Sequence, residues 1–448
     1  MINIKQLLLI IASFGFLITD AAGQNPFIQD QFTADPTARV FNGRVYVYPS
    51  HDIPAQPGRG RAGWFVMEDY HVFSSDNLTD WTDHGVIVTQ GKVNWVDSTT
   101  FSMWAPDCIE RKGKYYFYFP SNQKPVYGKG FTVGVAISDN PYGPFIPQLE
   151  PIKNVSGIDP NVLIDKDGQA YLYWSQGNIF MVKLKENMLE LASEPQVIGN
   201  LPQKGLKEGP FVFERNGKYY LTFPHVENKI ERLEYATGDN PVGPFKVTGV
   251  IMDESPTGCW TTHQSIVRYN NQWYLFYHHN DLSPKFDKNR SIRVDSLFFN
   301  EDGTIRKVIP TLRGVGLTEA TKEIQIDRYS SISDNGASIA FLDSLNTFKG
   351  WKTILGTKDA WVQYNAVNFG DRKLNSVEIR ALSQNGGILQ IFLDKADGPL
   401  LAEIKIPNST EWNTVITSKL KFQNGIHNLV VLLKDNKPVE VDWIKFQN

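Results

Sequence analysis

The sequence predicts an all-β protein in which a five-bladed β-propeller is followed by a smaller β-sandwich of the jelly-roll type. Two observations support the propeller: one hairpin pattern recurs five times before residue 280, and no long segment between the copies has helical periodicity. A third supports the sandwich, because the pattern then stops while short alternating strands continue. With 448 residues the chain is too long for one ordinary core. We therefore predict a propeller at 24–318 and a sandwich at 319–448.

The N-terminal segment has the features of an export signal. Lys5 supplies a positive charge, Leu7–Ile18 is a short apolar run, and Ala21–Gly23 offers small residues for cleavage. Because the run is too short to span a bilayer, we expect a signal peptide at 1–23, a mature start at Gln24 and no membrane span. The protein is expected to be secreted or periplasmic.

The composition is that of a globular protein, with 41% hydrophobic and 21% charged residues. A net charge of -3 gives no reason to expect nucleic acid or an acidic membrane as partner. Aromatic residues make up 12%, which suits strand cores and also flat surfaces that stack on sugars. Cys108 and Cys259 lack metal-ligand spacing, so we expect two free buried thiols, with one disulfide as the alternative.

The recurring hairpin is the basis of the propeller prediction. Each copy has a short apolar strand, a turn with Gly or Asn, and an aromatic-rich strand. The copies start roughly fifty to seventy residues apart, which suits one four-stranded blade each. A tandem set of sandwich hairpins would explain the alternation but not the fivefold recurrence. The copies are ADPTARVFNGRVYVY (34–48), APDCIERKGKYYFYF (105–119), DPNVLIDKDGQAYLYW (159–174), EGPFVFERNGKYYLTF (208–223) and HQSIVRYNNQWYLFY (263–277).

Ionisable residues open most of these copies. Innermost strands of a propeller line its channel, so equivalent strand ends meet at one mouth. Pro directly follows Asp35 and Asp159, and Pro belongs at the start of a strand rather than inside a ladder. We therefore predict that three carboxylates converge on one cavity. The opening residues are Asp35, Ala105, Asp159, Glu208 and His263.

Converging carboxylates repel one another, so their placement in one cavity needs an explanation, such as binding of a metal ion or acid–base catalysis. Glycoside hydrolysis uses two carboxyl groups, one that protonates the leaving oxygen and one that activates water. Neighbouring blades carry Asp159 and Glu208, so Asp159 would raise the proton affinity of Glu208 as a general acid requires. Asp35 lies across the channel and suits the base. A separation of roughly 6.5–9.5 Å would suit inversion.

The ordered motifs ADPTARVFNGRVYVYPSHD, WAPDCIERKGKYYFYFP, GIDPNVLIDKDGQAYLYW, EGPFVFERNGKYYLTFP and THQSIVRYNNQWYLFYH resemble glycoside hydrolase family 43 over about residues 25–315. The resemblance implies a five-bladed propeller with an inverting mechanism. It implies that Asp35 is the base, Asp159 the orienting, pKa-raising residue and Glu208 the acid. The finer resemblance is to arabinoxylan arabinofuranohydrolases.

Further residues are candidates for binding substrate. His263 matches an axial histidine that lies beside a calcium ion or water cluster in several family members; a hydrogen-bonded His without metal is the alternative. Arg293 resembles the family's pocket arginine; an ordinary arginine of a strand or of the surface, without a role in binding, is the alternative. Trp104 precedes a strand start and could stack on sugar or simply pack. Asp52, after His51, follows the first hairpin and is expected to line the pocket, with a solvated loop residue as the alternative.

The C-terminal segment, which ends in VDWIKF (441–446), resembles family 6 carbohydrate-binding modules. The resemblance implies a structural calcium held by Gln325, Asp327 and Asp442, oxygen ligands that suit this ion. It also implies a sugar cleft built on Trp412, with Trp351 as its partner. Glu440 replaces an Asn that usually binds sugar, so a sandwich that binds no glycan is the alternative.

Taken together, these features predict an inverting, exo-acting α-L-arabinofuranosidase on arabinoxylan or a related plant cell-wall polysaccharide. The alternatives are a β-xylosidase or another family 43 activity, such as arabinanase or galactanase. A non-catalytic glycan-binding propeller is the alternative of another class. We expect a monomer without an organic cofactor.

Overall fold

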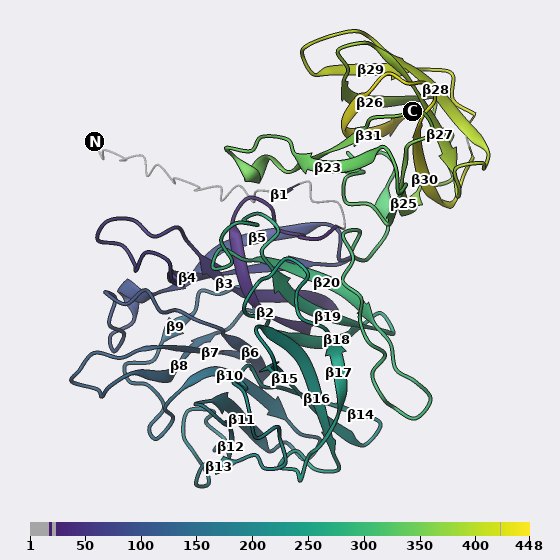
Figure 1. Ribbon diagram of the computed structural model, residues 1–448. Coiled ribbons are helices and arrows are strands. Elements are labelled where there is room, and N and C mark those ends of the chain that lie inside the picture. The colour runs from purple at the N-terminus through teal and green to yellow at the C-terminus, as the bar shows by residue number, and fades with distance from the viewer. Residues whose placement is uncertain (1–17, 20–23, 422) are drawn as a thin grey trace, which may run out of the picture.

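The computed structural model describes residues 18–19, 24–421 and 423–448, and it folds into two β-domains (Figure 1). The predicted signal peptide lies outside these residues except for β1 (Ile18–Thr19), which pairs with the outer edge of the first blade. In the described part of the chain, helical structure is confined to two 3₁₀ turns, Gln90–Lys92 and Thr347–Lys349. No described helix has the length and apolarity needed to cross a membrane.

Five antiparallel sheets form the propeller. Their innermost strands, β2, β6, β10, β14 and β18, contact one another in that order, and β18 contacts β2. Blade one consists of β2 (Phe32–Phe41), β3 (Arg44–Asp52), β4 (Met67–Ser75) and β5 (Trp81–Thr89). Blade two consists of β6 (Asp107–Arg111), β7 (Lys114–Asn122), β8 (Phe131–Ser138) and β9 (Ile146–Pro147). Blade three consists of β10 (Ile158–Ile164), β11 (Ala170–Ser175), β12 (Ile179–Lys183) and β13 (Gln196–Val197). Blade four consists of β14 (Phe211–Arg215), β15 (Lys218–Val226), β16 (Glu231–Gly238) and β17 (Lys246–Met252). Blade five consists of β18 (Ser265–Tyr269), β19 (Gln272–His279) and β20 (Ser291–Leu297).

Tight turns fix the register of the predicted hairpins. Both residues of Asn42–Gly43, Lys112–Gly113 and Asn216–Gly217 have positive φ, between 50° and 80°. Such turns match the twist of the flanking strands, and Gly adopts this conformation without steric cost. The aromatic strands that follow them supply the cores between blades, so most of the aromatic content serves packing.

The fifth blade departs from the prediction of four strands, because its described sheet has only three, β18 to β20. The N-terminal segment takes the place beside β20 instead. The side-chain amide of Asn25 donates to Val294 O at 3.0 Å and accepts from Val294 N–H at 2.8 Å, and Thr33 N–H donates to Arg290 O at 3.0 Å. These contacts close the ring between its first and last blades.

The sandwich has two facing sheets around one apolar core. Its sheets are β21 (Thr318–Glu319), β22 (Ser331–Ile332), β25 (Trp361–Asn368), β30 (Ile426–Leu433), β27 (Gly387–Leu393) and β28 (Leu400–Ile406), against β23 (Ala337–Phe341), β24 (Trp351–Leu355), β31 (Val439–Gln447), β26 (Ser376–Leu382) and β29 (Asn413–Thr417). Trp351 packs against Phe32 and Leu282 of the propeller, and the guanidinium of Arg313 donates to Asn365 O at 2.8 Å. The two domains are therefore in direct contact.

Candidate active site

One cavity of about 190 Å³ opens at the mouth of the propeller channel, and Asp35, Asp159 and Glu208 all line it. The predicted convergence of three carboxylates from blades one, three and four is therefore what the structure shows. The remaining lining residues are Trp64, Phe65, Met67, Trp104, Ala105, Ile158, Trp260, Thr261, Thr262, His263 and Arg290.

β-Bulges aim two of these carboxylates into the cavity. The pairing of β2 with β3 shifts between Ala34 and Thr37, so Asp35 bulges out with a φ of 48°. The pairing of β10 with β11 shifts in the same way around Asp159, which has a φ of 57°. A bulge re-aims the side chain at the cost of ladder bonds, and Asp tolerates a positive φ better than most residues. The Pro that follows each Asp thus lies at a bulge rather than at the strand start. Pro has no backbone N–H to donate to the ladder, and a bulge, like a strand start, tolerates that missing hydrogen bond.

Hydrogen bonds and an ion pair hold the Asp35 carboxylate. Arg290 Nη1 donates to one oxygen at 2.7 Å, and Ser50 Oγ donates to the other at 2.7 Å. The Asp35 N–H donates to His278 Nδ1 at 3.0 Å, which keeps that imidazole oriented. Burial raises the pKa of Asp35, but the charge of Arg290, aided by the hydrogen bond from Ser50, opposes it, and the net pKa lies below the ordinary aspartate value. Asp35 is therefore ionised and able to accept a proton from water.

Arg290 is a functional residue that sequence reasoning missed. Its side chain is buried, and it reaches Asp52 through two bonds of 2.9 Å while also bonding Asp35. Burial raises the pKa of Asp52 even though Arg290 lowers it. Asp52 was expected to line the pocket, yet it lies behind Arg290, outside the cavity lining. Its role in the structure is to fix the arginine that holds Asp35.

Arg293, the predicted pocket arginine, also lies away from the cavity lining. Its Nη1 contacts His279 Nδ1 at 2.6 Å, and its Nη2 donates to Thr311 O at 2.8 Å. Alternate residues of a strand face opposite sides, so residues three apart on this segment have different surroundings. Arg290 directly precedes β20 and lines the cavity, whereas Arg293 lies within the strand.

We expect the Arg290→Lys variant to shift the acid side of the pH–rate profile to higher pH. Lysine keeps the charge but cannot bond Asp35 and Asp52 together, so the pKa of Asp35 rises and its ionised fraction falls at low pH. Arg293→Lys is the matched control, because it should lower the melting temperature without moving that limb. Profiles of kcat/KM measured below the unfolding temperature test this, and equal shifts in both variants would refute the assignment of Arg290.

The acid side of the cavity holds two carboxyl groups on neighbouring blades. Gly209 N–H donates to Asp159 Oδ2 at 3.0 Å, beside the backbone of Glu208. Burial and the nearby charge of Glu208 raise the pKa of Asp159 well above the ordinary value. Burial also raises the pKa of Glu208, aided by Asp35. The pKa of Glu208 is raised, as a general acid requires, but by burial and Asp35 rather than by Asp159 as predicted, and the hydrogen bond with Glu231 opposes the rise.

Glu231, at the start of β16, is a further carboxyl that the hairpin repeat did not reveal. It is buried behind Glu208, hydrogen-bonds its carboxyl, and accepts a bond from Thr262 N–H at 2.7 Å. Burial and the charge of Glu208 raise the pKa of Glu231 well above the ordinary value. A protonated Glu231 donates to Glu208 and so fixes the orientation of the proposed acid.

We expect Glu231→Gln to raise the melting temperature more at about pH 8 than at about pH 5. Because the pKa of Glu231 is raised on folding, the folded state loses stability as pH rises from the ordinary Glu range through the folded pKa. Glutamine has no such proton and can keep both hydrogen bonds, and each kcal/mol regained is worth about 2–4 °C. Glu214→Gln, an exposed change on the same blade, is the control. A difference that does not vary with pH would refute the explanation.

Two other predicted residues line the cavity. Trp104 packs against Phe131 at 4.5 Å between ring centroids and lines the cavity together with Trp260, so these rings are candidates for stacking on a sugar. His263 is nearly buried, and burial lowers its pKa to about 4, so its imidazole is neutral. A calcium ion near His263 remains a prediction. Arg290 places a positive charge in the same cavity, which opposes a cation there.

In the sandwich, Trp412, Gln325 and Asp442 line a second, wider cavity. Asp327 is not among its lining residues; it is buried and ion-paired with Arg328 Nε at 3.0 Å. Trp351, expected beside Trp412 in the sugar cleft, is buried against the propeller instead. Packing between the two domains therefore buries one of the two tryptophans that were predicted to form the sugar cleft.

The calcium predicted for the sandwich is not tested by the structure, but its ligand set can be compared with what the ion needs. Asp442 is ion-paired with Arg380, and Asp327 with Arg328. Burial raises the pKa of Asp327 to about 6, although Arg328 lowers it. Calcium needs several free oxygen ligands. Guanidinium groups on two of the three predicted ligands fit that requirement poorly.

A glycoside hydrolase is the class of protein that this arrangement defines, since one carboxyl with a lowered pKa and another with a raised pKa line one cavity walled by aromatic rings. The chain belongs to the family described as Glycosyl hydrolases family 43, whose model matches residues 23–305. A second model, Carbohydrate binding module (family 6), matches residues 335–448.

Individual relatives support this membership. Xylosidase/arabinosidase 43A of Humicola insolens is 37% identical, over 62% of this chain and 98% of its own length. Arabinoxylan arabinofuranohydrolase of Paenibacillus polymyxa is 24% identical over 95% of this chain and 75% of its own. A solved family 43 β-xylosidase/α-arabinofuranosidase from a compost metagenome, in complex with xylotriose, is 35% identical with a TM-score of 0.57, over 64% of this chain and 98% of its own.

Proposed function

We propose that the protein is an inverting, exo-acting hydrolase that releases a terminal α-L-arabinofuranosyl group from arabinoxylan or a related plant cell-wall polysaccharide. The observation that carries this proposal is the shared cavity of Asp35, Asp159 and Glu208. At about 190 Å³ it is smaller than sites of roughly 300–1,000 Å³ that enclose drug-sized ligands. Such a cavity suits one terminal sugar better than the interior of a polymer.

The mechanism follows from the protonation states of the carboxyl groups. Asp35, ionised by its bonds to Arg290 and Ser50, takes a proton from a water molecule on one side of the sugar. Glu208 gives its proton to the glycosidic oxygen on the other side, so that the leaving alcohol departs neutral. Water attacks the anomeric carbon opposite the departing bond, and the product has the inverted configuration. Asp159, whose Oδ2 accepts from Gly209 N–H, positions the neighbouring Glu208.

A β-D-xylosidase activity in the same cavity is a second candidate. It is favoured by three relatives of 32–37% identity, which are described as xylosidase/arabinosidases or as a β-xylosidase. The same three carboxyl groups serve either bond, so the shape of the cavity wall decides between the two sugars.

Nitrophenyl α-L-arabinofuranoside and nitrophenyl β-D-xyloside, assayed side by side, test both candidates. Turnover of the arabinoside supports the first, and turnover of only the xyloside would replace it with the second. NMR of the sugar released from arabinoxylan should show the inverted anomer as the first product. Internal cleavage of the chain, seen as oligosaccharides, would contradict exo action. We further propose that the protein is exported, which N-terminal sequencing of the secreted or periplasmic fraction tests.

A further inference from the structure

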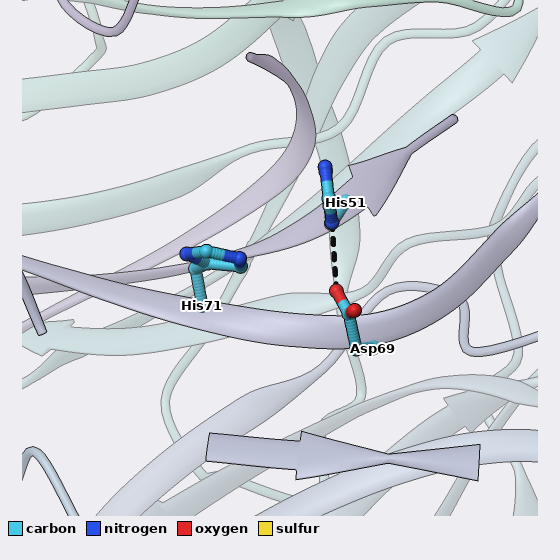
Figure 2. A group of neighbouring side chains, drawn as sticks. All are labelled: His51, Asp69 and His71. Carbon is cyan, nitrogen blue, oxygen red and sulfur yellow. Dashed lines mark hydrogen bonds and ion pairs between the residues drawn. The ribbon is translucent and has the colours of Figure 1, made fainter. Parts of the chain in front are cut away.

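Blade one carries a second cluster of chemically reactive side chains, outside the catalytic cavity. It consists of His51, Asp69 and His71, whose potential ligand atoms all lie within 4.8 Å of one another (Figure 2). The three side chains are between 13% and 20% exposed, so the cluster is partly sheltered yet open to solvent. His51 Nδ1 lies 2.7 Å from Asp69 Oδ1, and the two imidazole rings are 5.0 Å apart at nearly right angles.

Strand geometry holds these three residues on one face of the blade. Ser50 of β3 pairs with Tyr70 of β4, and the register shifts between Ser50 and Asp52, so His51 and Asp69 lie at a β-bulge. Their side chains meet on one face of the blade, and His71 lies two residues from Asp69 on the same strand. Both strands belong to the hydrogen-bonded sheet of the blade. The three ligand groups therefore come from paired strands rather than from a loop, at points where the register of the sheet is bulged.

Asp83, on the adjacent strand β5, orients His71. Both carboxylate oxygens of Asp83 lie 3.2 Å from His71 Nδ1, and Asp83 is itself held by Gly85 N–H at 2.7 Å and by Gln31 Nε2 at 3.3 Å. A carboxylate on Nδ1 favours the tautomer with its proton there and its lone pair on Nε2. This carboxylate–histidine pair is the arrangement that usually supports a metal-binding imidazole.

We propose that His51, Asp69 and His71 bind a divalent transition-metal ion of the zinc type. Two imidazoles and one carboxylate are ligands that such an ion prefers, while calcium and magnesium prefer oxygen alone. The ion would replace the proton between His51 and Asp69, and Asp83 would support His71 from behind. A water molecule from the solvent side would complete a tetrahedral site.

The site lies next to the residues that hold the catalytic base. His51 stands between Ser50, which donates to Asp35, and Asp52, which holds Arg290. A bound ion would tie β3 to β4 at this point. The expected consequence is a more stable propeller, because an ion that binds only the folded state adds its binding free energy to folding. This inference does not depend on which sugar the enzyme cleaves.

The test uses the full chain, stripped of metal with a chelator and then titrated with Co²⁺ and Zn²⁺ separately. One equivalent of Co²⁺ should produce the visible absorption of a tetrahedral nitrogen–oxygen site, and Zn²⁺ should remove it. Zn²⁺ should also raise the melting temperature. Absence of both signals in the unchanged protein would overturn the proposal.

Variants locate the site. Asp69→Asn and His71→Gln should abolish the Co²⁺ signal, and Asp83→Asn should weaken binding by about 10–100-fold. His427→Gln is the matched control, because His427 pairs with Asp394 at 3.1 Å in the sandwich. Melting temperatures in chelator show whether each variant folds. Binding that survives in folded Asp69→Asn and His71→Gln, or that is lost in His427→Gln, would overturn the assignment.

Discussion

Glu208→Gln is expected to slow release of sugar from arabinoxylan or xylo-oligosaccharides by about 10²–10⁴-fold, the usual contribution of a general acid. The leaving alkoxide of a natural glycan is a strong base and needs the proton that Glu208 supplies. A nitrophenolate leaves without that proton, so turnover of the nitrophenyl glycoside should fall far less. The amide matches the carboxyl in size, and the folded protein should therefore be preserved.

Glu214→Gln is the matched control for this experiment, since Glu214 is exposed on β14 of the same blade. Rates of both variants on both substrates, with melting temperatures, separate a lost proton donor from a damaged fold. If the glycan and the nitrophenyl glycoside lost the same factor in Glu208→Gln, Glu208 would not be the acid.

Asp35→Asn is expected to lose about 10²–10⁴-fold on the glycan and on the nitrophenyl glycoside alike. Activation of water is needed whatever the leaving group, so a good leaving group cannot compensate for a missing base. The acid limb of the pH–rate profile should also disappear from the remaining activity, because the group that titrates there, with its lowered pKa, is gone.

Asn cannot keep the ion pair with Arg290, so the variant should also unfold at a lower temperature. Asp76→Asn, an exposed carboxylate change in blade one, serves as control. Assays well below the unfolding temperature keep the two effects apart. Selective retention of nitrophenyl turnover in Asp35→Asn would assign Asp35 the role of an acid rather than a base.

The positions of the three carboxylates were predictable because a repeat places equivalent residues at equivalent places. Asp35, Asp159 and Glu208 open copies of one hairpin, so a fold with pseudo-rotational symmetry brings them together without knowledge of any other contact. Local patterning likewise predicted the turn at Asn42–Gly43.

Residues outside the repeat could not be placed in this way. Arg290 meets Asp35 across 255 positions of sequence, and nothing in the local pattern distinguishes it from Arg293. Glu231 begins a third strand, which the hairpin alignment does not cover. Trp351 reads as an exposed sugar-binding ring until the propeller surface that buries it is known. Each of these depends on packing between distant segments, which strand periodicity does not encode.

Closure of the ring by Asn25 and Thr33 against the last blade has a consequence for biosynthesis. The segment that carries Asp35 leaves the ribosome early, whereas Arg290 and its strand emerge some 255 residues later. Until then Asp35 and Asp52 lack their common cation, and the barrier to bringing such remote segments together rises with their separation along the chain. A nascent chain truncated within blade five should therefore be without hydrolytic activity, even where its first four blades have already formed.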